Sequence, residues 1–139
     1  MTIIVVMGGT FRHQEEVISG LMRARPGQVE KLCLAGLVDP KQRIERYQFL
    51  FSRTAVNERA TLVVGVETPE EVVALRGLGA HFCHVRGPLA PVFKTLPILI
   101  NDHHVASDWW TKDKPDMVLT PQELLSECLI ANRKTRVRR

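Results

Sequence analysis

Short apolar runs alternate with amphipathic segments along this chain. Continuous runs rich in Val, Ile and Leu predict strands that are buried on both faces. Such runs occupy residues 2–7, 32–38, 61–66 and 80–85, with a weaker run at 97–100 and a short one at 117–119. Gly8 and Gly9 directly follow the first run, so we expect a sharp turn at that point.

Between these runs, apolar residues recur at helical spacing. Three of the amphipathic segments begin with a capping residue and a proline, which is a typical helix start. The pairs are Asp39 and Pro40, Thr68 and Pro69, and Thr120 and Pro121. The predicted helices span residues 13–25, 40–51 and 69–79, and a last helix begins at residue 121. This alternation predicts an α/β three-layer sandwich with a mostly parallel sheet.

The composition fits one globular domain. The chain has 139 residues, of which 45% are apolar and 24% are charged. Its three cysteines are far apart and form no CxxC pair, which argues against a disulfide framework and against a structural zinc site. No signal peptide or membrane span is apparent, so we expect a cytoplasmic protein with no membrane partner. Residues 1–131 are expected to form the domain and residues 132–139 a basic tail.

The net charge of +4 is concentrated at the carboxyl terminus. Five basic residues stand among the last eight, namely Arg133, Lys134, Arg136, Arg138 and Arg139. The rest of the chain is therefore close to neutral. The tail is open to two interpretations, a solvated terminus or a nucleic-acid-binding arm that contacts phosphates.

The turn after the first strand is a candidate phosphate site. In a parallel sheet, ligands bind where strands lead into helix N-termini, whose free amides favour anions. The candidate residues in this stretch are Gly8, Gly9, Thr10, Arg12 and His13. The glycines allow close approach to the backbone, and a guanidinium pairs well with phosphate. A turn that serves only to connect strand and helix is the alternative.

Residues 61–88 resemble the late strand–helix–strand unit of the deoxynucleoside monophosphate kinases of phages and bacteria, a branch of the adenylate-kinase-like P-loop fold. The matching positions are Glu71, Leu75, Gly79, Arg86 and Pro88. Residues 104–108 approximate the His-x-Ser-Glu element of these kinases, and residues 116–131 fit their final strand and helix. The resemblance implies a P-loop-kinase-like fold and nucleotide binding, with Arg86 as a further phosphate contact. Such a fold places the first strand between two later ones.

The departures from that family concern the residues that carry catalysis. Gln14 and Glu15 stand where a phosphate loop has Lys and Ser or Thr, and Gly65 and Glu67 stand where the family has Asp and Arg. Without that lysine and hydroxyl, the phosphates and Mg²⁺ lose their main protein contacts. The sequence thus predicts a degenerate relative that binds phosphate or nucleotide, or acts as a regulator, and needs no cofactor. Two alternatives remain: a nucleic-acid- or protein-binding module, and an active kinase that uses ATP and Mg²⁺.

Two further groups of residues stand out. Asp102, His103, His104 and Asp108 are four potential metal ligands within seven residues, but their spacing matches no known site, and we expect no metal there. The spacing of Arg43, Arg46 and Arg53 predicts a basic stripe on one helix face, facing solvent or an anionic groove.

The histidines of the run at 80–85 are expected to be structural. Because side chains alternate along a strand, His81 and Cys83 share one face, and His84 lies on the other. This arrangement favours a buried, hydrogen-bonded histidine over a metal ligand.

Overall fold

A computed structural model describes residues 2–51, 59–106 and 118–137, with side chains up to residue 131. Its sheet has six strands in the order β2-β3-β1-β4-β5-β6, and every neighbouring pair is parallel. The strands are β1 (Thr2–Met7), β2 (Val29–Cys33), β3 (Ala60–Val64), β4 (His81–Val85), β5 (His103–Val105) and β6 (Val118–Leu119). These strands confirm the predicted α/β class with a parallel sheet.

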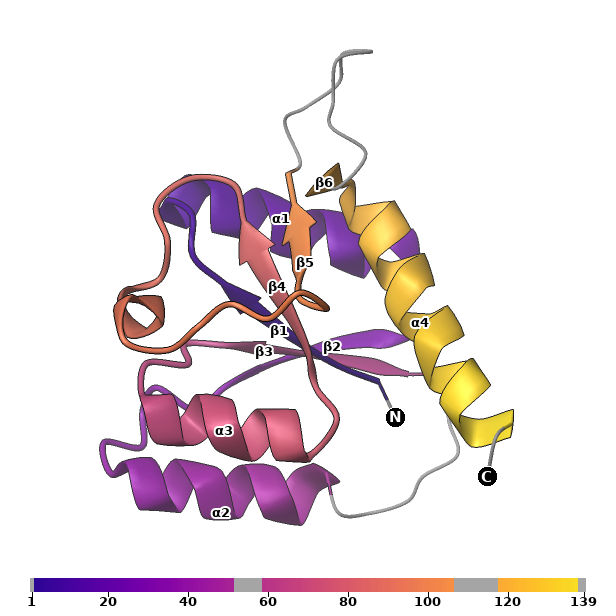
Figure 1. Ribbon diagram of the computed structural model, residues 1–139. Coiled ribbons are helices and arrows are strands. Elements are labelled where there is room, and N and C mark those ends of the chain that lie inside the picture. The colour runs from indigo at the N-terminus through magenta and orange to yellow at the C-terminus, as the bar shows by residue number, and fades with distance from the viewer. Residues whose placement is uncertain (1, 52–58, 107–117, 138–139) are drawn as a thin grey trace.

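Helices cover both faces of the sheet (Figure 1). They are α1 (Phe11–Ala24), α2 (Pro40–Phe51), α3 (Pro69–Gly77), the short 3-10 helix η1 (Pro91–Lys94) and α4 (Pro121–Val137). Helices α1 and α4 pack together on one face, and α2 and α3 pack together on the other (Figure 1). The arrangement is therefore three layers deep.

The central strand β1 contributes side chains to two hydrophobic cores, one on each face of the sheet. All six of its residues are buried, and alternate side chains point to opposite faces. Ile4 and Val6 belong to the core under α1 and α4, whereas Val5 and Met7 belong to the core under α2 and α3. A strand that is apolar throughout has no polar side to expose, so it occupies the middle of the sheet.

Two strands differ from the sequence-based prediction. The second strand is Val29–Cys33 rather than residues 32–38. It lies at the edge of the sheet and exposes polar residues such as Glu30 and Lys31, so its apolar signal is weak. The run at 97–100 forms no strand, and the fifth strand is His103–Val105. All three residues of this strand pair with β4, and two of them are histidines, so the strand has little apolar signal.

Within the described part of the chain, no helix is long and apolar enough to cross a membrane. Helix α4 extends to Val137, so the positions of Arg133, Lys134 and Arg136 belong to its last turns. Arg138 and Arg139 lie outside the described residues.

Candidate functional site

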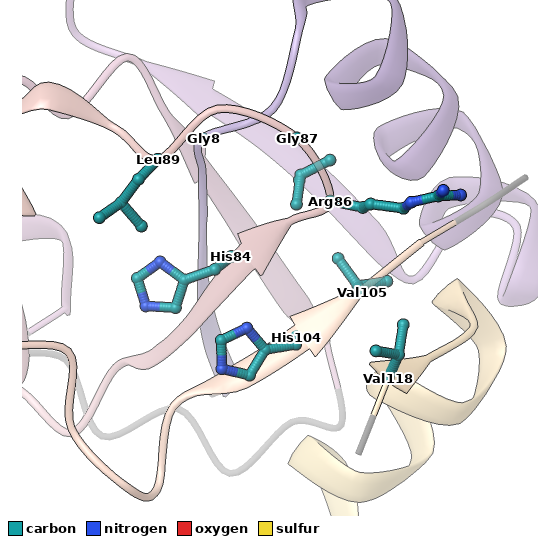
Figure 2. A pocket seen from close by; sticks show the side chains of 9 residues that line it. Gly8, His84, Arg86, Gly87, Leu89, His104, Val105 and Val118 are labelled. Carbon is teal, nitrogen blue, oxygen red and sulfur yellow. The ribbon is translucent and has the colours of Figure 1, made fainter. Parts of the chain in front are cut away.

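The site lies at the carboxyl edge of the sheet, between β1 and β4. The chain goes from β1 to β2 and β3 on one side, whereas β4, β5 and β6 lie on the other side. Such a switch point leaves a crevice in which α/β proteins bind ligands. A cavity of about 230 Å³ lies next to this point, at the carboxyl ends of β4, β5 and β6 (Figure 2). The residues that line it are Gly8, His84, Val85, Arg86, Gly87, Leu89, His104, Val105 and Val118.

The turn after β1 packs tightly against the loop after β4. The Gly9 amide donates a hydrogen bond to the Pro88 carbonyl, 2.7 Å away. Gly9 has a φ of +73°, and a Cβ added to it would lie 2.7 Å from the Val85 side chain. Both the backbone conformation and the close approach therefore require glycine here. Because its amide already has an acceptor, Gly9 offers less to an anion than an open phosphate loop does.

The other residues of the predicted phosphate site are arranged around the start of α1. Thr10 is the N-cap, and its side chain accepts a hydrogen bond from the His13 amide. The exposed Arg12 side chain pairs with Glu16 one turn along the helix, 3.2 Å away. Of the predicted set, only Gly8 and Arg86 line the cavity. The Arg86 side chain is exposed and extends from β4 over the end of β5 (Figure 2).

His84 of the cavity wall belongs to a hydrogen-bonded network with the buried Asp102 carboxylate and the partly exposed Arg76. The Arg76 guanidinium donates to both carboxylate oxygens of Asp102, at 2.8 and 2.9 Å. The same carboxylate lies 3.0 Å from Nε2 of His84 and also accepts from the Leu99 amide. Burial alone would raise the pKa of Asp102, but the hydrogen bonds from Arg76, His84 and Leu99 outweigh it and lower that pKa. Asp102 is therefore a carboxylate at neutral pH.

The charge on Asp102 determines the tautomer of His84. Burial lowers the pKa of His84, so its ring is neutral near pH 7. A carboxylate only accepts hydrogen bonds, so Nε2 of His84 carries the proton and Nδ1 has a free lone pair. The Nδ1 atom is buried and has no hydrogen-bond partner among the described residues. The His84 side chain lines the cavity, so a small movement that exposes Nδ1 would offer an acceptor to a ligand's N–H or O–H group.

His104 completes this wall of the cavity. The rings of His84 and His104 lie next to each other on the paired strands β4 and β5, with centroids 5.5 Å apart (Figure 2). Phe93 of η1 packs edge-on against the His84 ring at 4.7 Å. His84 is thus buried and hydrogen-bonded, as the strand alternation predicted.

The predicted group at residues 102–108 does not stay together. Asp102 binds Arg76 and His84 beside the α3 face, and His104 lines the cavity. His103 points to the opposite face of β5, and Asp108 lies outside the described residues. Alternation of side chains along β5 separates the two histidines.

The predicted basic stripe on the second helix is wrong for Arg43. Its side chain is buried and hydrogen-bonded to the fully buried Glu71 of α3 at 3.0 Å. Arg46 is exposed, and Arg53 lies outside the described residues. A helix periodicity identifies residues that share a face, but it does not show whether a buried carboxylate faces them.

The Asp102–His84 pair was not predicted, because its residues are 18 positions apart and meet only when β4 and β5 pair. The prediction that the carboxyl-terminal basic residues bind nucleic acid also stays a prediction.

Comparisons with protein-family models, with curated proteins and with solved structures find no significant match to this chain.

Proposed function

We propose that this chain is a reduced relative of the nucleotide kinases that binds a nucleoside monophosphate without transferring a phosphoryl group. The observation that carries the proposal is the cavity at the switch point, between the Gly8 turn and Arg86. The position of β1 between β3 and β4 supports the kinship, because a kinase-like sheet is expected to have that order.

The phosphate is assigned to the end of the cavity near Arg86. Among the described residues that line it, Arg86 is the one with a permanent positive charge. The N-terminus of α1 begins close by, after Gly8 and Thr10, and its dipole favours an anion at the same end. The neutral ring of His84 gives the opposite wall a hydrogen-bond acceptor. A sugar hydroxyl or a base amino group satisfies that acceptor, whereas a phosphate oxygen does not.

The small cavity and the few contacts that it offers indicate weak binding. About 230 Å³ is less than the roughly 300–1,000 Å³ of sites that enclose drug-sized ligands. A helix N-terminus contributes about 0.3–1 kcal/mol and a charged hydrogen bond about 1.5–3 kcal/mol. Micromolar binding requires about 8 kcal/mol and millimolar binding about 4 kcal/mol, so these two contacts reach millimolar binding of a mononucleotide only at their upper end, and sugar and base contacts supply the rest.

Phosphoryl transfer is excluded from the proposal because its machinery is replaced. Gln14 occupies the position of the phosphate-loop lysine, and its side-chain amide donates to the Gly8 carbonyl at 3.3 Å. Glu15 follows where the Mg²⁺-binding hydroxyl would stand, and it pairs with Lys31 at 3.9 Å. A glutamine and a glutamate provide no positive charge to stabilise a transferring phosphoryl group.

The experiment is a titration with a deoxynucleoside monophosphate, followed by NMR. We expect a millimolar Kd for the natural chain and a Kd raised about 10-fold in Arg86→Gln, because a charged hydrogen bond is lost. Arg46→Gln is the matched control, since Arg46 is exposed on α2 and lines a different groove. An equal Kd in Arg86→Gln and Arg46→Gln contradicts the assignment of the phosphate to Arg86.

A further inference from the structure

Two histidines and a cysteine meet on the face of the sheet that α4 covers. They are His81 at the start of β4, His103 at the start of β5 and Cys128 on α4. One ligand atom from each lies within 4.8 Å of the other two. The two imidazole rings are 6.0 Å apart between centroids. The cluster lies on the opposite face from His84 and His104, so it is separate from the proposed nucleotide cavity.

Regular features of the fold bring these residues together. The register of β4 and β5 pairs Cys83 with His103, and His81 precedes Cys83 by two residues on the same face. Cys128 belongs to the apolar face of α4 that enters the core with Leu124 and Leu125. The buried Cys128 thiol of α4 thus lies next to the half-buried imidazoles of His81 and His103.

The chemistry of the three groups fits a borderline transition-metal cation. Imidazole nitrogen and thiolate sulfur are the preferred ligands of Zn²⁺, with bonds of about 2.0–2.1 Å and 2.3 Å. Tetrahedral bonds of these lengths place the ligand atoms roughly 3.3–3.6 Å apart. The atoms at up to 4.8 Å must therefore approach by about 1 Å, which rotation of the half-buried histidine side chains achieves.

The surroundings favour a cation as well. Burial and the neighbouring His81 lower the pKa of His103, which keeps this imidazole in the neutral form that binds metals. The charge of Glu127 acts on both His103 and Cys128 and adds a negative field at the cluster. Burial raises the pKa of the Cys128 thiol to about 12, which opposes metal binding, because the thiol must lose its proton to coordinate and the metal–thiolate bond has to offset that cost.

We propose that His81, His103 and Cys128 bind one Zn²⁺ ion. The three protein ligands leave a fourth position, which water fills because the two histidines are only half buried. The ion would join the amino ends of β4 and β5 to α4, on elements that also carry the cavity wall. The expectation of no metal at residues 102–108 concerned a different set of side chains, of which only His103 takes part. The proposal departs from the expectation that the histidines of residues 80–85 are structural, because it makes His81 a metal ligand.

The experiment is a titration of the chelator-treated full chain with Co²⁺, an optical probe for zinc sites. We expect one Co²⁺ per chain, a thiolate-to-cobalt charge-transfer band, and displacement of the Co²⁺ by Zn²⁺. Cys128→Ser should abolish the band, and His103→Ala should weaken binding at least about 10-fold. Two matched controls, His104→Ala on the other face of β5 and Cys33→Ser at an exposed thiol, should bind as the natural chain does.

Several results would overturn the zinc proposal. They are the absence of a thiolate band, a band that survives Cys128→Ser and disappears in Cys33→Ser, and a loss of affinity in His103→Ala smaller than about 10-fold. Because Cys128 is buried, its variant is checked for folding by circular dichroism. The half-buried His103 keeps the test decisive if Cys128→Ser does not fold.

Discussion

The carboxylate of Glu71 on α3 accepts a hydrogen bond at 3.0 Å from the guanidinium of Arg43 on α2, and both side chains are buried. Tyr47 donates to the other oxygen of Glu71 at 3.1 Å, and Thr68 donates to the same oxygen as Arg43 at 3.0 Å. The Arg43 guanidinium also donates to the carbonyl of Leu37. The polar groups of this cluster thus satisfy one another between the two helices, where a lone charge would be costly.

Removing one member of this cluster should destabilise the fold. We expect Glu71→Ala to lower the free energy of unfolding by about 3–5 kcal/mol, because it leaves the Arg43 charge buried without its partner. Urea denaturation followed by circular dichroism measures the effect. Glu70→Ala, at the exposed neighbouring position, is the control and should cost less than about 1 kcal/mol. Similar losses of unfolding free energy in both variants would show that the Arg43–Glu71 pair does not stabilise the fold.

The tight turn after β1 gives a second prediction. Gly9→Ala places a methyl group 2.7 Å from Val85 at a φ of +73°, so we expect a loss of about 2 kcal/mol or more. Gly77→Ala is a control in α3, where an added Cβ meets nothing within 4 Å. That control should change stability by less than about 1 kcal/mol. If Gly9→Ala is as stable as the control, the two loops are not packed as described.

The buried His84 should make stability fall as the pH falls. Burial lowers its pKa in the folded chain, whereas the unfolded chain titrates near 6.5. Below that pH the unfolded chain takes up a proton that the folded chain resists, until the folded pKa is reached. The charged or titratable groups that face the ring are Asp102, Arg76 and His104.

The test compares the natural chain with His84→Gln in the presence of a chelator. The stability difference between them should shift in favour of His84→Gln as the pH falls from about 7.5 to 5. Urea denaturation at several pH values measures this difference. A difference that stays constant over this range would mean that His84 titrates alike in the folded and unfolded chains.

The replacement of the phosphate-loop lysine predicts the absence of kinase activity. A coupled assay with ATP, Mg²⁺ and each deoxynucleoside monophosphate should show no turnover, because Gln14 and Glu15 provide no positive charge for the transferring group. Turnover that Arg86→Ala abolishes would contradict this prediction, since Arg86 would then serve in place of the lysine.

The strands with the strongest apolar signal were predictable, and the edges of the sheet were not. The central strands β1, β3 and β4 consist almost wholly of buried residues, so their sequence is apolar on both faces. By contrast, only Val29 of β2 is buried, and β5 has only three residues, two of them histidines. Such strands form because a neighbour offers a backbone edge to pair with, and the local sequence does not report this.

In the candidate site, too, the sequence indicated residues next to apolar strands but not the contacts that depend on strand pairing. Gly8 was predictable because it directly follows the first apolar strand, whereas Arg86 was expected from the resemblance of residues 61–88 to the kinases. The Asp102–His84 contact and the His81–His103–Cys128 cluster depend on which strands pair and on where α4 packs. Arg43 was predicted as a surface cation, because the sequence does not show that the buried Glu71 carboxylate lies opposite it.

A map of backbone amide shifts decides whether a mononucleotide binds at the carboxyl edge of the sheet. The isotope-labelled chain is titrated with a deoxynucleoside monophosphate up to about 10 mM, a range set by the expected millimolar Kd. We expect saturable shifts at Gly8, Arg86, Gly87 and His104, which are among the residues that line the cavity. Shifts confined to α2 or to the carboxyl-terminal turns of α4, or no shifts at all, would contradict this expectation.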